Sequence, residues 1–324
     1  MTELEQAIIS TLVYYDLLNR PLTGLELFKF LIRPNPLECS TGLMGQTVEF
    51  NHFLTQLEQS QVIKSLVQKY QGHYFLKERK PQKLFTLRQK RIKISQVKWR
   101  KTKKAVKILQ AVPFIQMIGI TGSLSIDNAK EESDLDFFIA LAPNRLWIGR
   151  TFVTLVLSLF GRRRHHNKIK DRACLNCYLA DPNLAIGPEI KTYNLYSAQE
   201  YGQLISVWQT NKSTITKFNE ANLWIKNFLQ NYPWPNQINL KTAKPSRYLA
   251  IIKKFLEWLL GNKMGDWLEK RLAAWQTKRI ERKINKESST DHIYCSDYCL
   301  MFHPHAKGPE IFSRYEAKLK KLLI

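Results

Sequence analysis

The stretch GITGSLSIDNAKEESDLDFFIAL, residues 119–141, contains the most informative pattern in the chain. An apolar run predicts a buried strand, and Gly122 and Ser123 follow it directly. About ten residues later, Asp134 and Asp136 open a second apolar run, which predicts another strand. Side chains two residues apart in a strand face the same side, so the two carboxylates should project together.

This pattern has two interpretations. One is a turn followed by a strand that carries two surface carboxylates. The other is half of a phosphoryl-transfer site, because neighbouring carboxylates repel unless a cation lies between them. Mg²⁺ binds few protein carboxylates together with phosphate oxygens, and a glycine turn lets backbone N–H groups approach phosphate closely. We favour the second interpretation.

The strand, the Gly-Ser turn, the spacer and Asp-x-Asp together resemble the signature of the nucleotidyltransferase fold shared with DNA polymerase beta. The resemblance covers roughly residues 105–195. The strings NAKEESDLDFFI, NRLWIGR and CLNCYL are similar to uncharacterised bacterial nucleotidyltransferase-domain proteins with an N-terminal winged-helix-like segment. The resemblance implies an enzyme that depends on Mg²⁺, with Mn²⁺ as the alternative metal. Such an enzyme transfers a nucleoside monophosphate from an NTP to an acceptor hydroxyl. The resemblance also implies that Gly122 and Ser123 hold the triphosphate and that Asp134 and Asp136 are catalytic metal ligands.

Active members of this family carry a third carboxylate on a neighbouring strand, and the strand expected at 172–180 has none at the matching place. Its alternation predicts Cys174, Asn176 and Tyr178 on one face, with Asn176 at the third catalytic position. An amide oxygen can bind a metal, but an amide cannot accept a proton as a general base.

Two functional outcomes stay open at this point. The reaction proceeds without a third acid, or with Asp171 or Asp181, which flank the strand, as a substitute. Alternatively, the domain is a non-catalytic regulator that senses nucleotide or binds nucleic acid.

Basic residues near the pattern are candidates for phosphate binding. Lys130 lies just before the Asp-x-Asp pair, and Arg145 and Arg150 belong to a helix expected at 145–160. The loop at 161–172 is rich in arginine, whose forked donors match phosphate oxygens. The alternative for this loop is an ordinary solvated surface.

We expect an α+β protein, in which a mixed β-sheet of the nucleotidyltransferase type is flanked by helices. The expected boundaries are a winged-helix-like domain at 1–80, a basic linker helix at 81–110, the nucleotidyltransferase domain at 111–195 and a helical C-terminal domain at 196–324. In the last of these, Ser197 and Glu200 form an S-x-x-E pattern, which predicts that a helix begins there.

Residues 1–80 predict three short helices followed by a strand, a turn and a strand at 62–79, the order found in a winged-helix module. The third predicted helix, at 46–60, contains no lysine or arginine. Nucleic-acid binding through this helix and a role in protein contact or packing are therefore both open.

The charge balance favours an acidic partner. Lysine and arginine total 50 against 27 aspartates and glutamates, a net charge of +23. The partners that fit are a nucleoside triphosphate and RNA, DNA or another anionic acceptor. The densest basic block is the helix expected at 81–110, for which contact with a polyanion and a solvated face are both open.

The segment 247–285 is a long amphipathic pattern, in which we expect Trp258, Trp267 and Trp275 to pack in a core. A role at a membrane surface is the alternative. The longest apolar run, 146–160, is short for a bilayer span and contains an arginine, so we expect no transmembrane segment. The acidic start of the chain does not match a signal peptide, which predicts a cytoplasmic protein.

Overall fold

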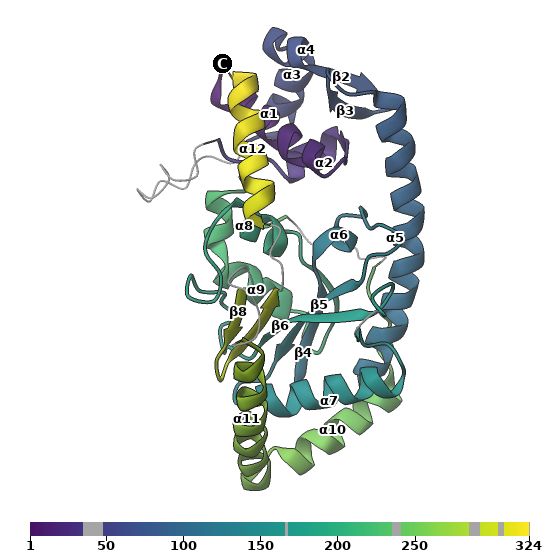
Figure 1. The fold of residues 1–324 in the computed structure, drawn as a ribbon, viewed down its shortest axis with the longest axis vertical. Coiled ribbons are helices and arrows are strands. Elements are labelled where there is room, and N and C mark those ends of the chain that lie inside the picture. The colour runs from purple at the N-terminus through teal and green to yellow at the C-terminus, as the bar shows by residue number, and fades with distance from the viewer. Residues whose placement is uncertain (35–47, 166–167, 235–240, 285–291, 304–307, 324) are drawn as a thin grey trace.

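The computed structural model describes residues 1–34, 48–165, 168–234, 241–284, 292–303 and 308–323. Figure 1 shows an elongated molecule, with the N-terminal helices at one end and a β-sheet in the middle. The helices of residues 247–284 lie at the other end. Within the described residues, no helix has both the length and the apolar character needed to cross a bilayer.

The N-terminal part of the chain forms a small module of helices and a three-stranded sheet. Its elements are α1 (Glu3–Leu17), β1 (Leu22–Thr23), α2 (Gly24–Lys29), α3 (Phe50–Gln59), α4 (Gln61–Leu66), β2 (Val67–Tyr70) and β3 (His73–Leu76). The strands are antiparallel in the order β1-β3-β2. The predicted succession of helices and a hairpin is present, and the winged-helix assignment stays a prediction.

The start of the hairpin differs from the prediction. The sequence predicts a strand from residue 62, but the first part of that run forms α4. Ser60 gives the reason: its hydroxyl accepts a hydrogen bond from the backbone N–H of Ile63 and donates one to Glu5 at 2.5 Å. A serine that caps a helix in this way stabilises a new helical turn, so the strand begins only at Val67.

A single helix of 29 residues, α5 (Pro81–Leu109), joins this module to the rest of the molecule along one side (Figure 1). It occupies the residues at which the basic linker helix is predicted. Two of its arginines point inward and fasten the module: Arg88 donates to Glu26 at 2.7 Å, and Arg91 donates to the carbonyl of Leu18 at 2.8 Å.

The central sheet is mixed, as expected for an α+β protein. Its strands are β4 (Ile115–Ile120), β5 (Leu135–Leu141), β6 (Ala173–Leu179), β7 (Ile205–Gln209), β8 (His292–Cys295) and β9 (Cys299–His303). Their order in the described part of the chain is β7-β4-β5-β6-β9-β8. β5 and β6 are parallel, and the other neighbouring strands are antiparallel.

Helices surround this sheet. They are α6 (Gly122–Ser125), α7 (Leu146–Leu159), α8 (Leu195–Gly202), α9 (Thr214–Ala221), the 3₁₀ helix η2 (Leu223–Asn227), α10 (Arg247–Leu260), α11 (Lys263–Ile284) and α12 (Gly308–Leu323). α10 and α11 form a helical hairpin at one end of the molecule, and α12 returns to pack against α1 and α8 (Figure 1).

The region 196–324, expected as a helical domain, also contributes three strands to the central sheet. β7 extends the sheet beyond β4, and β9 and β8 extend it beyond β6. Without them β4 and β6 would be open edges with unpaired backbone groups, and a buried sheet edge must be paired or covered. The helix expected from Ser197 begins earlier, because Asn194 caps α8 and accepts from the backbone N–H of Ser197 at 2.9 Å.

The core lies on both faces of the central sheet. On one face, Phe138 and Cys177 pack in a cluster that continues into α1, α8 and α12. On the other face, Phe137 and Tyr178 pack with residues of α5 and α7. The N-terminal module therefore shares one continuous core with the sheet.

The tryptophans of the α10–α11 hairpin are not part of this core, which corrects the prediction made for them. Trp258 is 75% exposed, and Trp267 and Trp275 are each 59% exposed. An amphipathic pattern shows which residues share a helix face, but it does not show whether that face is turned inward.

Candidate functional site

The turn between β4 and α6 brings the chain against the start of β5. Gly122 has a φ of +67°, and a Cβ atom at this position would collide with the carboxylate of Asp136. Only glycine satisfies both conditions without strain. The backbone N–H of Thr121 donates to the carbonyl of Asp136 at 3.1 Å, which extends the pairing of β4 with β5 up to the turn. Ser123 lies next in the turn, and its carbonyl accepts from the N–H of Asn128 at 2.8 Å.

The two aspartates of the Asp-x-Asp pair lie together at the start of β5. Leu135 and Phe137 are buried on the opposite side of the strand, as the alternation predicts. One oxygen from each of Asp134 and Asp136 and the sulfur of Cys174 all lie within 4.8 Å of one another. These three residues form the carboxylate–thiol cluster. Cys174 was not among the predicted site residues. The sequence indicated only that it shares a strand face with Asn176.

Asn176 contacts the cluster from a β-bulge. Phe137 pairs with Leu175 and Phe138 pairs with Cys177, so Asn176 is an extra residue between the two pairs. Its amide donates to Asp136 Oδ1 at 2.5 Å. At the position where the resemblance predicts a carboxylate, the chain therefore has a donor, which neutralises no metal charge and accepts no proton.

The bulge also corrects the predicted alternation of β6. Cys174 and Asn176 do share a face with Asp136, since both form hydrogen bonds in the cluster. Tyr178 does not: it packs in the cluster of Phe137 on the opposite face. One extra residue reverses the facing of every later side chain in a strand, which local alternation cannot reveal.

Burial and repulsion raise the proton affinity of the cluster. Burial raises the pKa of Asp136 to about 7, and the charges of Asp134 and Glu200 add to this shift. Burial raises the pKa of Cys174 to about 12, and the charges of Asp134 and Asp136 add to this shift. This thiol is therefore protonated at neutral pH. It donates to the amide oxygen of Asn176 at 2.8 Å. A concentration of negative charge in an enclosed place attracts a cation.

Glu200 is a further acidic residue that the sequence did not identify as part of the site. It lies on α8, where its charge raises the pKa values of both Asp136 and Tyr196. Its carboxylate is 3.7 Å from the ammonium of Lys191. The S-x-x-E pattern suggested that Glu200 belongs to a helix cap, but Asn194 supplies the cap of α8 instead.

The two carboxylates that flank β6 have other roles. Asp171 accepts from the ammonium of Lys98 at 2.7 Å and also binds Lys101. Lys98 donates further to the carbonyls of Glu131 and Ser133, so it fixes the loop that leads into the Asp-x-Asp pair. Asp181 accepts from backbone N–H groups of the turn after β6. Neither is placed to substitute for the third acid.

The structure does not bring the predicted phosphate-binding arginines of α7 to the cluster. Arg145 forms a 2.7 Å ion pair with Asp266 of α11 and lies over the ring of Phe114. Arg150 binds Gln276 of α11 and lies over the ring of Phe302. Both side chains are thus committed to contacts with neighbouring elements.

One basic residue of the arginine-rich loop does contact the carboxylate–thiol cluster, whereas Lys130 is placed only as an exposed loop residue. Arg164, from the loop at 161–172, donates to Asp134 at 2.7 Å and to the sulfur of Cys174 at 3.4 Å. Lys130 is exposed in the loop before β5, and its backbone N–H donates to the hydroxyl of Ser133. Among the loop residues that the structure describes, Arg164 is therefore the one with hydrogen bonds to the cluster.

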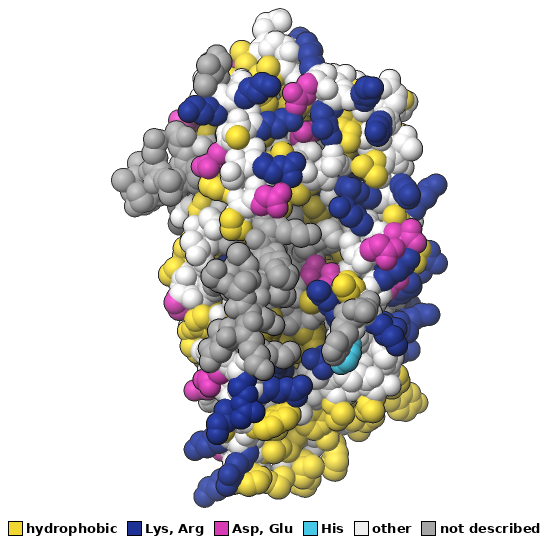
Figure 2. Space-filling view, viewed as in Figure 1, with side chains coloured by type: hydrophobic (Ala, Val, Ile, Leu, Met, Phe, Trp, Pro, Cys, Tyr) yellow, Lys and Arg dark blue, Asp and Glu magenta, His cyan; other side chains and the backbone are white. Residues whose placement is uncertain are grey.

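The outer side of α5 carries a row of cations. Its exposed basic residues recur at spacings of three, four or seven and are Lys83, Lys90, Lys93, Arg100, Lys104 and Lys107. These six residues form the α5 basic stripe, and residues at such spacings share one face of a helix. Dark blue side chains follow the same edge of the molecule in Figure 2.

Comparison with known proteins gives no relative: no family model, no curated protein and no solved structure matches the chain. Function is therefore inferred from the geometry of the carboxylate–thiol cluster and its surroundings.

Proposed function

We propose that the protein is a metal-dependent nucleotidyltransferase, which transfers a nucleoside monophosphate from an NTP to an acceptor hydroxyl. The observation that carries this proposal is the close approach of Gly122 to Asp136, with Asp134 beside them. In the reaction, the acceptor oxygen forms a bond to the α-phosphorus, the bond from that phosphorus to the bridging oxygen breaks, and pyrophosphate leaves.

The residues of the cluster fit Mg²⁺ or Mn²⁺. Asp134 and Asp136 would hold the ion, since carboxylate oxygens are the ligands that these hard cations prefer. Cys174 is a protonated thiol that already donates to Asn176, which makes it unsuited to a hard cation. When bound, the ion neutralises charge on the phosphates and on the oxygens that react.

The protein's own residues would orient the substrate around this position. Gly122 has no side chain, which lets Asp136 lie directly against the turn whose backbone would face the phosphates. Arg164 now pairs with Asp134, and its fork is suited to the phosphates of an NTP. Asn176 holds one oxygen of Asp136 and so fixes the orientation of that carboxylate.

The acceptor hydroxyl must lose a proton, and Asn176 cannot accept it. We propose to test Glu200 as this base: it is a carboxylate on α8, largely buried beside Lys191 at 3.7 Å, and its charge acts on Asp136. Its location on α8 differs from the strand position that the family uses. The assignment predicts that Glu200→Gln lowers kcat more than it changes the KM for NTP.

The test uses each of the four labelled NTPs with total RNA as acceptor, in Mg²⁺ and in Mn²⁺. It measures both incorporation of label and release of pyrophosphate. The wild type should release pyrophosphate, and the Asp134→Asn/Asp136→Asn variant should not. Asp181→Asn is the matched control, because this carboxylate lies at the far end of β6 and its amide keeps an accepting oxygen.

Binding of Mn²⁺ followed by its electron paramagnetic resonance signal gives a readout that needs no acceptor. The double variant should lose this binding and the control should keep it. Absence of both Mn²⁺ binding and pyrophosphate release in the wild type would refute the proposal.

A second function is favoured by the α5 basic stripe together with Asn176. The stripe offers consecutive cations to a nucleic-acid backbone, and the missing acid is expected in a protein that binds without turnover. We therefore keep a nucleic-acid-binding regulator as the alternative. RNA binding that survives Asp134→Asn/Asp136→Asn, with no pyrophosphate release by the wild type, would favour it.

A further inference from the structure

Helix α10 buries charged residues and exposes apolar ones. Lys253 is buried and donates to Glu257 at 2.7 Å, and Glu257 also accepts from the backbone N–H of Phe114 at 2.7 Å. The exposed large apolar side chains of this helix are Tyr248, Ile251, Ile252, Phe255, Trp258 and Leu259. Tyr248 is 82% exposed. A helix whose outer face meets only water has the opposite arrangement.

Helix α11 also buries a carboxylate and exposes tryptophans. Glu269 points inward and accepts from the backbone N–H groups of Trp147 and Ile148 at 2.7 and 2.8 Å. Trp267 and Trp275 point outward instead. Arg271 lies over the ring of Trp267 and Arg279 lies over the ring of Trp275, at 5.5 and 5.9 Å from the ring centres.

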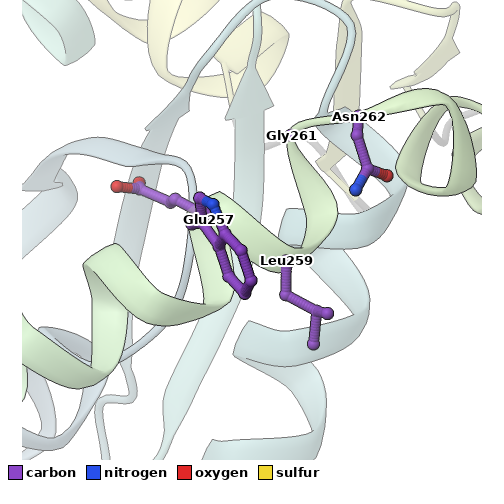
Figure 3. Close-up of a pocket in the computed structure, with 5 residues that line it drawn as sticks. Glu257, Leu259, Gly261 and Asn262 are labelled. Carbon is purple, nitrogen blue, oxygen red and sulfur yellow. The ribbon is translucent and has the colours of Figure 1, made fainter.

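Helix α10 presents an apolar surface at the end of the molecule, and α11 adds the exposed side chains of Trp267 and Trp275. Figure 2 shows hydrophobic side chains gathered there, over the region of α10 in Figure 1. At the corner between the helices, a shallow hollow of about 420 Å³ is lined by Glu257, Trp258, Leu259, Gly261 and Asn262. Figure 3 shows Glu257 and Leu259 leaving α10 in different directions. A contiguous exposed surface of this kind marks a place of contact with an apolar phase or partner.

The charges around this surface identify the partner. The exposed cations of the hairpin are Arg247, Lys254, Lys263, Lys270, Arg271, Lys278, Arg279 and Arg282. The exposed acids in the described part of the hairpin are Asp266, which pairs with Arg145, and Glu281. An apolar face bordered by cations complements the surface of an anionic bilayer, where tryptophan and tyrosine lie at the headgroup level.

Two other partners fit less well. A second copy of the chain would place the same cations against one another, which is unfavourable. A single-stranded nucleic acid would use the tryptophans for stacking, but the aliphatic side chains of Ile251 and Leu259 offer bases no aromatic surface.

We propose that the α10–α11 hairpin is a membrane-docking element that lies in the headgroup region of an anionic bilayer. Its apolar side chains enter the interface, its arginines and lysines contact lipid phosphates, and neither helix spans the bilayer.

This docking leaves the carboxylate–thiol cluster accessible. The cluster lies at the start of β5, beside the end of β4. The hairpin instead contacts the opposite ends of these strands: Glu257 binds the backbone just before β4, and Asp266 pairs with Arg145 after β5. Membrane docking by the hairpin therefore does not depend on the proposed transferase activity. If both hold, the reaction takes place at a membrane surface.

The test is co-flotation of the full chain with vesicles of phosphatidylcholine alone or of equal parts phosphatidylcholine and phosphatidylglycerol. The wild type should bind the anionic vesicles and bind the neutral ones much more weakly. Added salt should reduce the binding, because it screens the lipid charge. Phe255→Ser/Trp258→Ser should lower the partition coefficient about tenfold or more, since two large apolar side chains no longer enter the interface.

The matched control is Val97→Ser/Leu223→Ser, which replaces two exposed apolar residues on other elements. It should bind like the wild type. All three proteins should show the same thermal unfolding, because every substituted side chain is exposed. Equal binding of the Phe255→Ser/Trp258→Ser variant, or equal binding of the wild type to both kinds of vesicle, would overturn the proposal. A wild-type dimer that this variant dissociates, together with no vesicle binding, would instead assign the surface to a second copy.

Discussion

Gly122 and Asp136 approach so closely that no side chain fits between them. A Cβ atom on Gly122 would overlap Asp136 Oδ2 and come within 3.2 Å of its Cγ. Because Asn176 holds the other oxygen at 2.5 Å, the carboxylate has little room to turn away. The glycine therefore fixes the position of the residue on which the proposed metal site depends.

Gly122→Ala should both destabilise the protein and weaken Mn²⁺ binding. A positive φ alone costs alanine about 1 kcal/mol, and displacement of Asp136 adds to that cost. Gly72→Ala is the control, since Gly72 has a φ of +71° but a Cβ atom there would meet nothing within 4 Å beyond its chain neighbours. Urea unfolding and Mn²⁺ binding are measured on both variants. Unchanged Mn²⁺ affinity in Gly122→Ala would contradict the role given to this contact.

Lys98→Met should destabilise the fold by about 2 to 4 kcal/mol, because it leaves two carbonyls and one oxygen of Asp171 without their buried donor. The side chain of Lys98 is 2% exposed. Lys104→Met, on the exposed side of the same helix, should change the free energy of unfolding by less than about 0.5 kcal/mol. Urea denaturation of both variants checks the difference, and similar values for the two would refute the interpretation of Lys98.

Acid should weaken the contact between the N-terminal module and α5 through Glu26. Burial alone would raise the pKa of Glu26, but Arg20 and Arg88 outweigh it and lower this pKa to about 2. A lowered pKa means that the stabilisation is complete above pH 4.5, the ordinary value, and is lost as the pH falls towards 2. The shift corresponds to about 3 kcal/mol at neutral pH.

Glu26→Gln should therefore remove part of the pH dependence of unfolding between about pH 4.5 and 2. Chemical denaturation at a series of pH values measures this. Glu131→Gln is the control, since that carboxylate is exposed and pairs with Lys170 at the surface. An acid limb that is the same in wild type and Glu26→Gln would disprove the assignment.

The α5 basic stripe makes a prediction about salt. If it contacts RNA, Lys93→Gln/Arg100→Gln/Lys104→Gln should weaken binding and reduce the slope of log K against log salt by about 2 to 3. Fluorescence anisotropy with a labelled RNA at several salt concentrations measures the slope. Lys212→Gln/Lys217→Gln/Lys244→Gln removes the same charge from exposed positions outside α5. Equal effects of the two triple variants would show that net charge acts without a specific contact on α5.

The local part of the candidate site could be predicted from sequence. Three features follow from short-range patterns: the spacing of Gly122 and Asp136, the strands before Gly122 and around Asp136, and the placement of Asn176 on the next strand. The contribution of Glu200 could not be predicted, because it comes from a helix more than sixty residues away from Asp136 in sequence. The pairing of β7, β8 and β9 with the sheet is equally non-local.

The sequence also could not predict which way the amphipathic faces of α10 and α11 are turned. The spacing of Trp258, Trp267 and Trp275 is compatible with a buried face or an exposed one. The choice is made by Glu257 and Glu269, which accept hydrogen bonds from backbone N–H groups elsewhere in the fold and so turn the acidic side inward. Such long-range contacts leave no signal in the local pattern.

The packing of α12 against α1 bears on how the protein is made. Tyr315 joins the core that contains Tyr14, and Lys318 donates to Asp16 across 302 residues of sequence. A ribosome releases the N-terminal module long before it releases α12, so this part of the core stays open until α12 has been made. The apolar side of α1 therefore stays partly uncovered while the intervening elements are synthesised.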